Sequence, residues 1–210
     1  STVRVSRRVL LAGAAAVGLT ACMRNGGSGR GGTTIAPGSG GDPLLSPADA
    51  RSVDGRLEVE LVAAAGTVRW QGGSRFATTY NDAVPGPTLR VRPGDRVVVT
   101  LRNDLDEPTN LHTHGLHVSP SGDSDNILVM VEPGQSHTYT YDIPDDHPSG
   151  TYWYHPHHHG LVARQLSGGM AGVIVVEDDL DALPEMAATT ERVLVISDPA
   201  IGADSSVLDV

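Results

Sequence analysis

The sequence predicts an all-β protein built as a Greek-key β-sandwich. Short runs of strand-forming residues follow one another along the chain, and Pro-Gly or Asp-rich turns separate them. In the clearest runs polar and apolar residues alternate, which is typical of strands with one face in a core and one in solvent. No long segment shows the helical period of 3.6 residues. The eight predicted strands are 57–63, 75–80, 88–91, 96–103, 110–114, 136–143, 151–154 and 172–176.

The first 21 residues predict an export signal that is separate from the fold. Arg7 and Arg8 precede a run of small apolar residues, the pattern of a twin-arginine signal. The run ends in Leu-Thr-Ala-Cys at residues 19–22, which resembles the lipobox of bacterial lipoproteins. We therefore expect lipidation at Cys22 and a membrane anchor on the extracytoplasmic side. An ordinary signal peptide would instead give a periplasmic or secreted protein.

The rest of the chain divides into a tether, a domain and a linker. Residues 22–50 are rich in glycine with little to bury, which predicts a flexible tether. Residues 51–180 are long enough to form one core. After them an acidic stretch is typical of a linker, and 192–197 predicts one more strand. Because a lone strand cannot bury its own face, we expect residues 181–210 to be a linker and the first strand of a truncated second domain.

The composition excludes several classes of protein. Fifteen basic residues, all arginine, stand against 25 acidic ones, and the formal net charge is -10. This balance, with no basic stripe, argues against a nucleic-acid-binding surface. Cys22 is the only cysteine. With that thiol used for lipid, the domain has none left for a disulfide, a thiolate catalyst or a blue copper centre.

Two histidine pairs carry the strongest functional signal. His112 and His114 are separated by one residue, and so are His155 and His157. Alternate side chains of a strand leave the same face, so each pair points both imidazoles one way. Four neutral imidazoles from two strands suit a borderline metal such as copper or zinc.

The sequence motifs around these histidines narrow the choice of metal. The four motifs are Val84-Pro85-Gly86-Pro87-Thr88, Arg92-Pro93-Gly94-Asp95, Leu111-His112-Thr113-His114-Gly115-Leu116 and Gly150-Thr151-Tyr152-Trp153-Tyr154-His155-Pro156-His157. In this order and spacing they resemble the first cupredoxin domain of the multicopper oxidases, the laccase-like family. The resemblance covers residues from about 56 to about 198. It implies a cupredoxin-like, plastocyanin-type sandwich, followed by the beginning of a second cupredoxin domain.

The resemblance also implies copper as the cofactor and a role for each histidine. His112 would bind the type 2 copper, while His114 and His155 would share one of the two type 3 coppers. His157 would bind the other type 3 copper. The domain would thus supply half of an eight-histidine trinuclear cluster. The other four ligands and the type 1 copper belong to the family's last domain, whose motifs do not occur in this sequence.

Three functional hypotheses remain open at this point. In the first, the chain is part of an exported oxidase that takes electrons from phenols or metal ions such as Cu(I) and passes them to O2. The 210-residue chain alone would then be inactive, a fragment needing a C-terminal cupredoxin domain. In the second, it is a non-catalytic lipoprotein that binds and buffers copper at the membrane. In the third, it completes its cluster with a separate chain, as two-domain laccases do by trimerising.

The remaining candidates are interpreted as structural. We expect Trp153 and Tyr154 to pack in the core beside the ligands. Met170 is expected to fill the core, because an axial copper ligand would need a cysteine partner. The loop around Asp125 lacks the Asp-Gly motif that is usual in the family, so no role is assigned to this loop. Five further histidines are left outside the predicted site: His117, His137, His147, His158 and His159.

Overall fold

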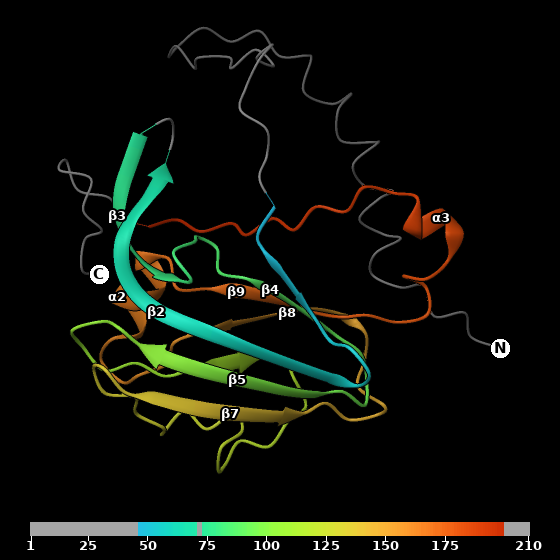
Figure 1. The fold of residues 1–210 in the computed structure, drawn as a ribbon, viewed down its shortest axis with the longest axis horizontal. Coiled ribbons are helices and arrows are strands. Elements are labelled where there is room, and N and C mark those ends of the chain that lie inside the picture. The colour runs from blue at the N-terminus through green and yellow to red at the C-terminus, as the bar shows by residue number, and fades with distance from the viewer. Residues whose placement is uncertain (1–45, 71–72, 200–210) are drawn as a thin grey trace, which may run out of the picture. The chain divides into compact units, whose positions relative to one another are not determined.

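The computed structural model describes residues 46–70 and 73–199, which form two β-sheets facing each other across a core (Figure 1). The predicted export signal, Cys22 and nearly all of the predicted tether lie outside the described residues, as do residues 200–210. In the part of the chain that is described, no helix is both long enough and apolar enough to cross a membrane.

One sheet has four strands in the order β3-β2-β5-β7. These are β2 (Arg56–Trp70), β3 (Gly73–Tyr80), β5 (Arg96–Asn103) and β7 (Ser136–Asp142). Strand β2 pairs antiparallel with β3 and parallel with β5, which pairs antiparallel with β7. Within β5, Val97, Val99 and Leu101 are buried while Arg96 and Arg102 are exposed. The predicted alternation is therefore confirmed.

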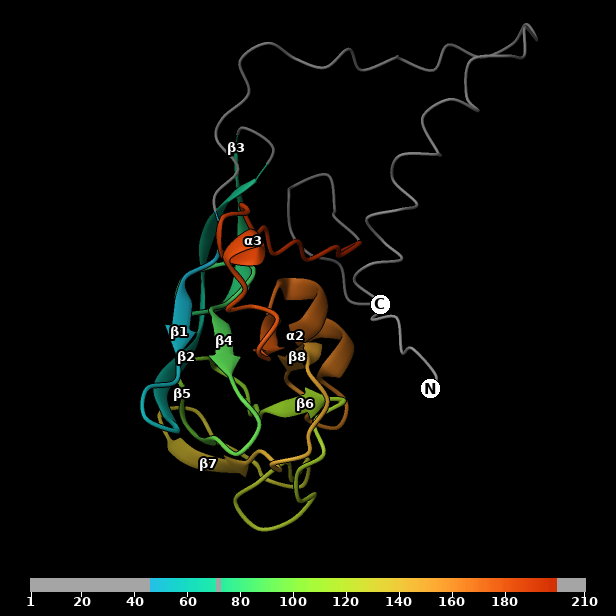
Figure 2. The ribbon, with the colours of Figure 1, turned by 90° about the vertical axis from the view of Figure 1, so that its right-hand side faces the viewer.

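The second sheet has five shorter strands in the order β1-β4-β9-β8-β6. These are β1 (Asp49–Arg51), β4 (Thr88–Val91), β6 (His112–His114), β8 (Gly150–His155) and β9 (Gly172–Val176). Strand β4 pairs parallel with β1 and β9, whereas β8 pairs antiparallel with β9 and β6. In Figure 2, β2 and β5 of the four-stranded sheet lie to the left of β6 and β8 of the five-stranded sheet. The predicted all-β sandwich is confirmed.

Strand β2 continues to Trp70, well beyond the predicted end at residue 63. The other differences from the sequence prediction concern short elements. Strand β1 and the helices α2 (Val162–Gly168) and α3 (Pro184–Ala187) are too short to give a periodic signal. The strand predicted over 192–197 does not form, since residues 190–199 have no regular secondary structure. No described strand pairs with this segment, and Ile196 is 96% exposed. A strand without a neighbour lacks partners for its backbone groups.

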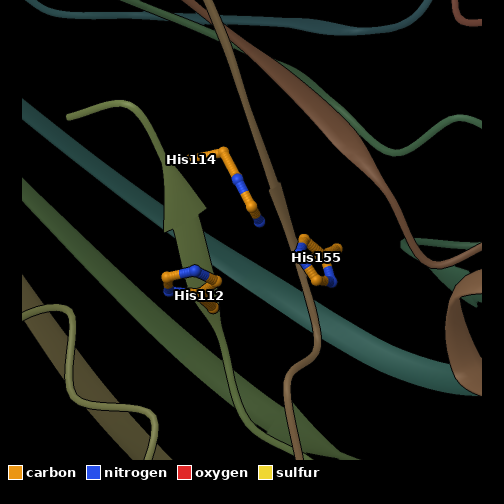
Figure 3. Close-up of side chains that lie close together, drawn as sticks. All are labelled: His112, His114 and His155. Atoms are coloured by element: carbon orange, nitrogen blue, oxygen red, sulfur yellow. The ribbon is translucent and has the colours of Figure 1, made fainter. Parts of the chain in front are cut away.

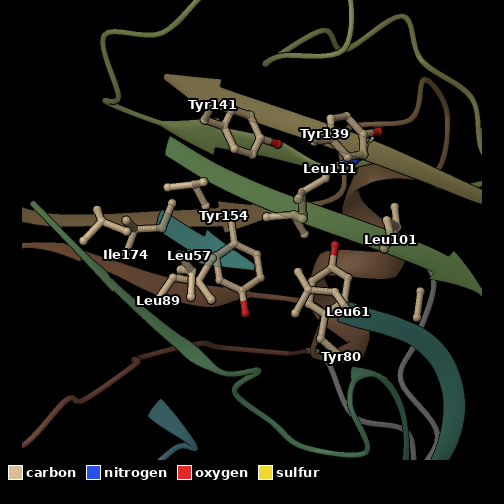
Figure 4. Close-up of a cluster of buried hydrophobic side chains, with 14 of the residues drawn as sticks. Leu57, Leu61, Tyr80, Leu89, Leu101, Leu111, Tyr139, Tyr141, Tyr154 and Ile174 are labelled. Carbon is tan, nitrogen blue, oxygen red and sulfur yellow. Dashed lines mark hydrogen bonds between the residues drawn. The ribbon is translucent and has the colours of Figure 1, made fainter. Parts of the chain in front are cut away.

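Aliphatic side chains and four tyrosines fill the core between the sheets (Figure 4). Two of these tyrosines hold the chain next to the histidine strands. The Tyr139 hydroxyl accepts a hydrogen bond from the backbone N–H of Leu111 at 3.1 Å, just before β6. The Tyr154 hydroxyl, in β8, donates to the carbonyl of Pro87 at 2.7 Å. Met170 is fully buried, as predicted.

A buried arginine joins the two ends of the described chain. Arg90 lies in β4, and its side chain is only 8% exposed. Its guanidinium donates to Asp49 in β1 at 2.8 Å and to Glu191, beyond α3, at 2.9 Å. Glu177, at the end of β9, lies 3.5 Å away and also binds Arg51 at 2.6 Å. One side chain thus connects the segment that enters the sandwich with the segment that leaves it.

Candidate metal centre

The register between β6 and β8 sets the histidines beside one another. His112 stands directly opposite His155, and His114 stands directly opposite Trp153. Residues paired across antiparallel strands project from the same face of the sheet, so these four side chains lie together. Tyr154, between Trp153 and His155, points the other way and is fully buried in the core, as predicted.

Three imidazoles are close enough to share a metal site (Figure 3). His112, His114 and His155 each place one ring nitrogen within 4.8 Å of the others. The ring of His157 lies beside this group, with its centroid 5.1 Å from that of His112 and 5.9 Å from that of His155. The structure therefore brings all four sequence-predicted histidines together.

His155 has the features of a metal ligand. Its Nδ1 donates to the carbonyl of Pro156 at 2.7 Å, which leaves the lone pair of its ring on Nε2. Nε2 is buried, and it has no hydrogen-bond partner among the described residues. Burial lowers the pKa of His155 to about 4, so the ring is neutral at pH 7. A buried acceptor without a partner beside other imidazoles fits a borderline metal such as copper.

Asp125 orients His112, although no role was predicted for it from the sequence. Its Oδ1 accepts from Nδ1 of His112 at 3.0 Å and from the backbone N–H of Thr113 at 2.9 Å. The carboxylate thus selects the tautomer of His112 that leaves Nε2 available to a metal. Asp125 lies in a loop, so strand periodicity does not relate it to β6. The one sequence signal for its role is that this acidic loop closely follows the motif containing His112 and His114.

Asn110 holds the backbone of His157 in place. Its Oδ1 accepts from the backbone N–H of His157 at 2.6 Å, and its Nδ2 donates to the carbonyls of Ile127 and Val129 at 2.9 and 3.2 Å. Asn110 is fully buried. It ties the segment before β6 to His157, in the loop after β8, a long-range contact that sequence spacing does not reveal.

The prediction that Trp153 packs in the core is wrong. Its side chain is 37% exposed and lies on the histidine face. The reason is the alternation along β8, in which Tyr152 and Tyr154 turn toward the core side and Trp153 turns away from it. The indole stacks on the rings of His114 and His155, with centroid distances of 4.5 and 4.4 Å.

The histidines left outside the predicted site have other surroundings. Both ring nitrogens of His147 are engaged: Nε2 accepts from the backbone N–H of His117 at 3.0 Å, and Nδ1 donates to the carbonyl of Pro148 at 2.9 Å. His137 lies in β7, in the other sheet, 3.5 Å from Asp123. Neither His137 nor His147 belongs to the group that His112, His114 and His155 form.

Comparisons with known proteins point to the same chemistry. A family model described as multicopper oxidase matches residues 63–181. The multicopper oxidase mco of Staphylococcus haemolyticus is 39% identical over 107 residues, which are 50% of this chain and 23% of the relative. Copper resistance protein A of Escherichia coli is 32% identical over 156 residues, which are 73% of this chain and 24% of the relative. The chain therefore spans about a quarter of the length of the curated relatives it matches.

Solved structures give the same result. A multicopper oxidase from Campylobacter jejuni, described as a metallo-oxidase, superimposes with a TM-score of 0.58 at 30% identity, over 64% of this chain and 29% of that one. A variant of McoA from Aquifex aeolicus superimposes with a TM-score of 0.65 at 26% identity, over 79% of this chain and 37% of that one.

Proposed function

Because the chain belongs to the multicopper oxidase family, whose cofactor is copper, we propose that its domain supplies half of a trinuclear copper cluster to an oxidase. The observation that carries this proposal is the convergence of four imidazoles, those of His112, His114 and His155 from β6 and β8 and that of His157 from the loop after β8. In the proposed assignment His112 holds the type 2 copper, and His114 and His155 hold one type 3 copper. His157 holds the other.

The proposed reaction removes single electrons from a reductant and reduces O2 to water. When bound, the copper ions supply the electron storage that a four-electron reduction needs. Phenols or metal ions such as Cu(I) are the proposed reductants. Support for this range comes from relatives that include laccases of Thanatephorus cucumeris and a metallo-oxidase of Campylobacter jejuni.

The chain's own residues prepare the ligand atoms. The Asp125 carboxylate holds the Nδ1 proton of His112, and the Pro156 carbonyl holds that of His155. Each contact leaves an Nε2 lone pair directed away from its hydrogen-bonded partner. Asn110 fixes the backbone of His157. These contacts involve protein groups alone, and they orient two of the proposed ligand rings and the backbone of a third ligand.

The open face of the histidine group supports a half-cluster. His114 is exposed, and His112 and His157 are only half-buried. In the proposed assembly a C-terminal cupredoxin domain, in the same or a separate chain, covers this face and brings the remaining ligands and the type 1 copper. The sequence has no cysteine besides Cys22 to supply a blue centre.

Copper binding by the full chain tests the assignment. We expect Cu(II) to raise the unfolding temperature of the wild type, by a stabilisation of about 2.7 kcal/mol when free copper is 100 times the Kd. Replacing His112, His114, His155 and His157 with alanine should abolish the shift. The matched control replaces His117 and His137, two histidines outside the group, and should keep it. Undiminished copper stoichiometry in the fourfold variant would overturn the assignment.

Oxygen consumption separates catalysis from copper buffering, the alternative that the open face also fits. The copper-loaded chain alone should neither consume O2 with a phenol or Cu(I) nor show intense blue absorption. Adding a protein that contains the family's final cupredoxin domain should start O2 consumption, beyond any that this partner shows alone. Turnover by the isolated chain contradicts the half-cluster, and failure of every such partner favours buffering.

A further inference from the structure

An aromatic side chain lies inside the histidine group itself. The indole of Trp153 stacks on His114 with an interplanar angle of 19° and on His155 with one of 17°. The two imidazoles are also nearly parallel to each other, with centroids 5.0 Å apart and an angle of 25°. The three rings are therefore nearly parallel, and two of them belong to the proposed ligand set.

The histidines differ in what orients their rings. A hydrogen bond from Nδ1 holds His112 to Asp125, and another holds His155 to Pro156. For His114, the described residues provide no hydrogen bond to either ring nitrogen. Rotation of an imidazole about its Cβ–Cγ bond has broad minima, so an unbonded ring is poorly fixed. Ring contacts are therefore left to orient His114: the stacking on Trp153, and an edge contact with His112 at a centroid distance of 4.8 Å.

The backbone around Trp153 is well placed to orient a neighbour. Trp153 pairs with His114 on one side and with Val173 of β9 on the other, so it lies in an internal strand of the sheet. The cross-strand pairing puts the indole directly beside the imidazole of His114. An aromatic ring on a strand held from both sides offers a rigid surface, although Trp153 is partly exposed.

We propose that Trp153 is a positioning residue that fixes the ring planes of His114 and His155 so that both can donate to one copper ion. The inference rests on the proposed function, which assigns these two histidines to the same metal. The indole acts for His114 as the Asp125 carboxylate acts for His112, through ring contact in place of a hydrogen bond.

Replacing Trp153 with alanine and with phenylalanine tests the proposal in the full chain. We expect Trp153→Ala to weaken Cu(II) binding about tenfold, the effect of losing two aromatic contacts of ordinary size. Its Cu(II) electron paramagnetic resonance spectrum should broaden, because the freed rings bind copper in several geometries. Trp153→Phe keeps a stacking ring and should restore most of the affinity and the narrow spectrum. Phe76→Ala, which removes an exposed aromatic ring from β3 in the other sheet, is the matched control and should change neither.

The His114→Ala variant keeps the two proposals distinguishable. If His114→Ala loses copper while Trp153→Ala binds it with wild-type affinity and spectrum, the positioning role is wrong and the half-cluster stands. If neither variant changes copper binding, the proposed function fails as well. Should Trp153→Ala not fold when copper is removed, Trp153→Phe decides. A wild-type spectrum then supports the role, and an altered one in a folded protein contradicts it.

Discussion

The outward faces of the two sheets carry different chemistry. The outward face of the four-stranded sheet carries exposed ion pairs, such as that of Arg96 with Asp142 at 2.6 Å. On the five-stranded sheet, the outward positions of β6 and β8 carry histidines and Trp153, and β4 carries the buried Arg90. Long strands with ordinary surfaces thus form the scaffold, and short strands with unusual side chains carry the site.

This difference teaches how stability and function are divided in the domain. The scaffold sheet has an eight-residue register between β2 and β5 and depends on buried aliphatic residues. The site sheet depends on a three-residue register between β6 and β8. On its core side, hydrogen bonds from two buried tyrosines hold the chain next to these strands. Substitutions in the two sheets should therefore separate loss of folding from loss of copper.

The largest loss of stability is expected from the scaffold. Leu61 in β2 is fully buried, and Leu61→Ala should lower the free energy of unfolding by about 2–5 kcal/mol. Urea denaturation of the full chain measures the loss. The fraction that stays folded should bind copper with wild-type stoichiometry. A loss of copper sites in that fraction would break the division between the sheets.

A smaller loss is expected from Gly172→Ala in β9, but this one should reach the site. A Cβ at Gly172 would overlap the ring of Tyr154, the residue before His155. Overpacking of this kind costs about 1–3 kcal/mol. Because β8 must shift, copper affinity should fall too, as measured by titration. Gly66→Ala in β2 is the control, since its Cβ would meet nothing within 4 Å. Equal behaviour of the two variants would contradict this mechanism.

Arg90→Gln should have a moderate effect on stability alone. Burial would lower the pKa of Arg90, but hydrogen bonds to Glu191 and Asp49 outweigh it and raise the pKa, so the group stays charged. Removing that charge leaves Glu177 buried with one fewer partner. We expect a loss of about 1–2 kcal/mol, less than for a fully buried pair because Asp49 and Glu191 are 47% and 57% exposed. Urea denaturation tests this, and unchanged stability would count against it.

The smallest effect is expected from Arg96→Gln, the exposed counterpart of Arg90→Gln. Its pair with Asp142 lies in solvent, where water and salt screen the attraction. The midpoint of urea denaturation should stay at the wild-type value at moderate salt. A shift as large as that of Arg90→Gln would show that burial is not what separates the two arginines.

The scaffold and the strand histidines were predictable because their signals are local, whereas His157 lies in the loop after β8 and not on the strand that its spacing predicted. Alternation located β5, for example, and the two-residue spacing of His112 and His114 placed both imidazoles on one face. Trp153 was misplaced, although the same alternation that buries Tyr154 turns it outward. Asp125 and Asn110 reach the site from loops, and such contacts depend on the folded chain alone. The strand predicted over 192–197 does not form, because a strand needs a neighbouring strand to pair with as well as suitable residues.

Arg90 also bears on how such a domain can be rearranged within a protein. Asp49 lies before the first long strand and Glu191 lies beyond the last, yet both reach the same guanidinium. Domains whose ends lie close together tolerate insertion into other chains and circular permutation. In this sandwich the segments before the first long strand and beyond the last strand meet at one guanidinium, which is the closeness of ends that such insertion requires.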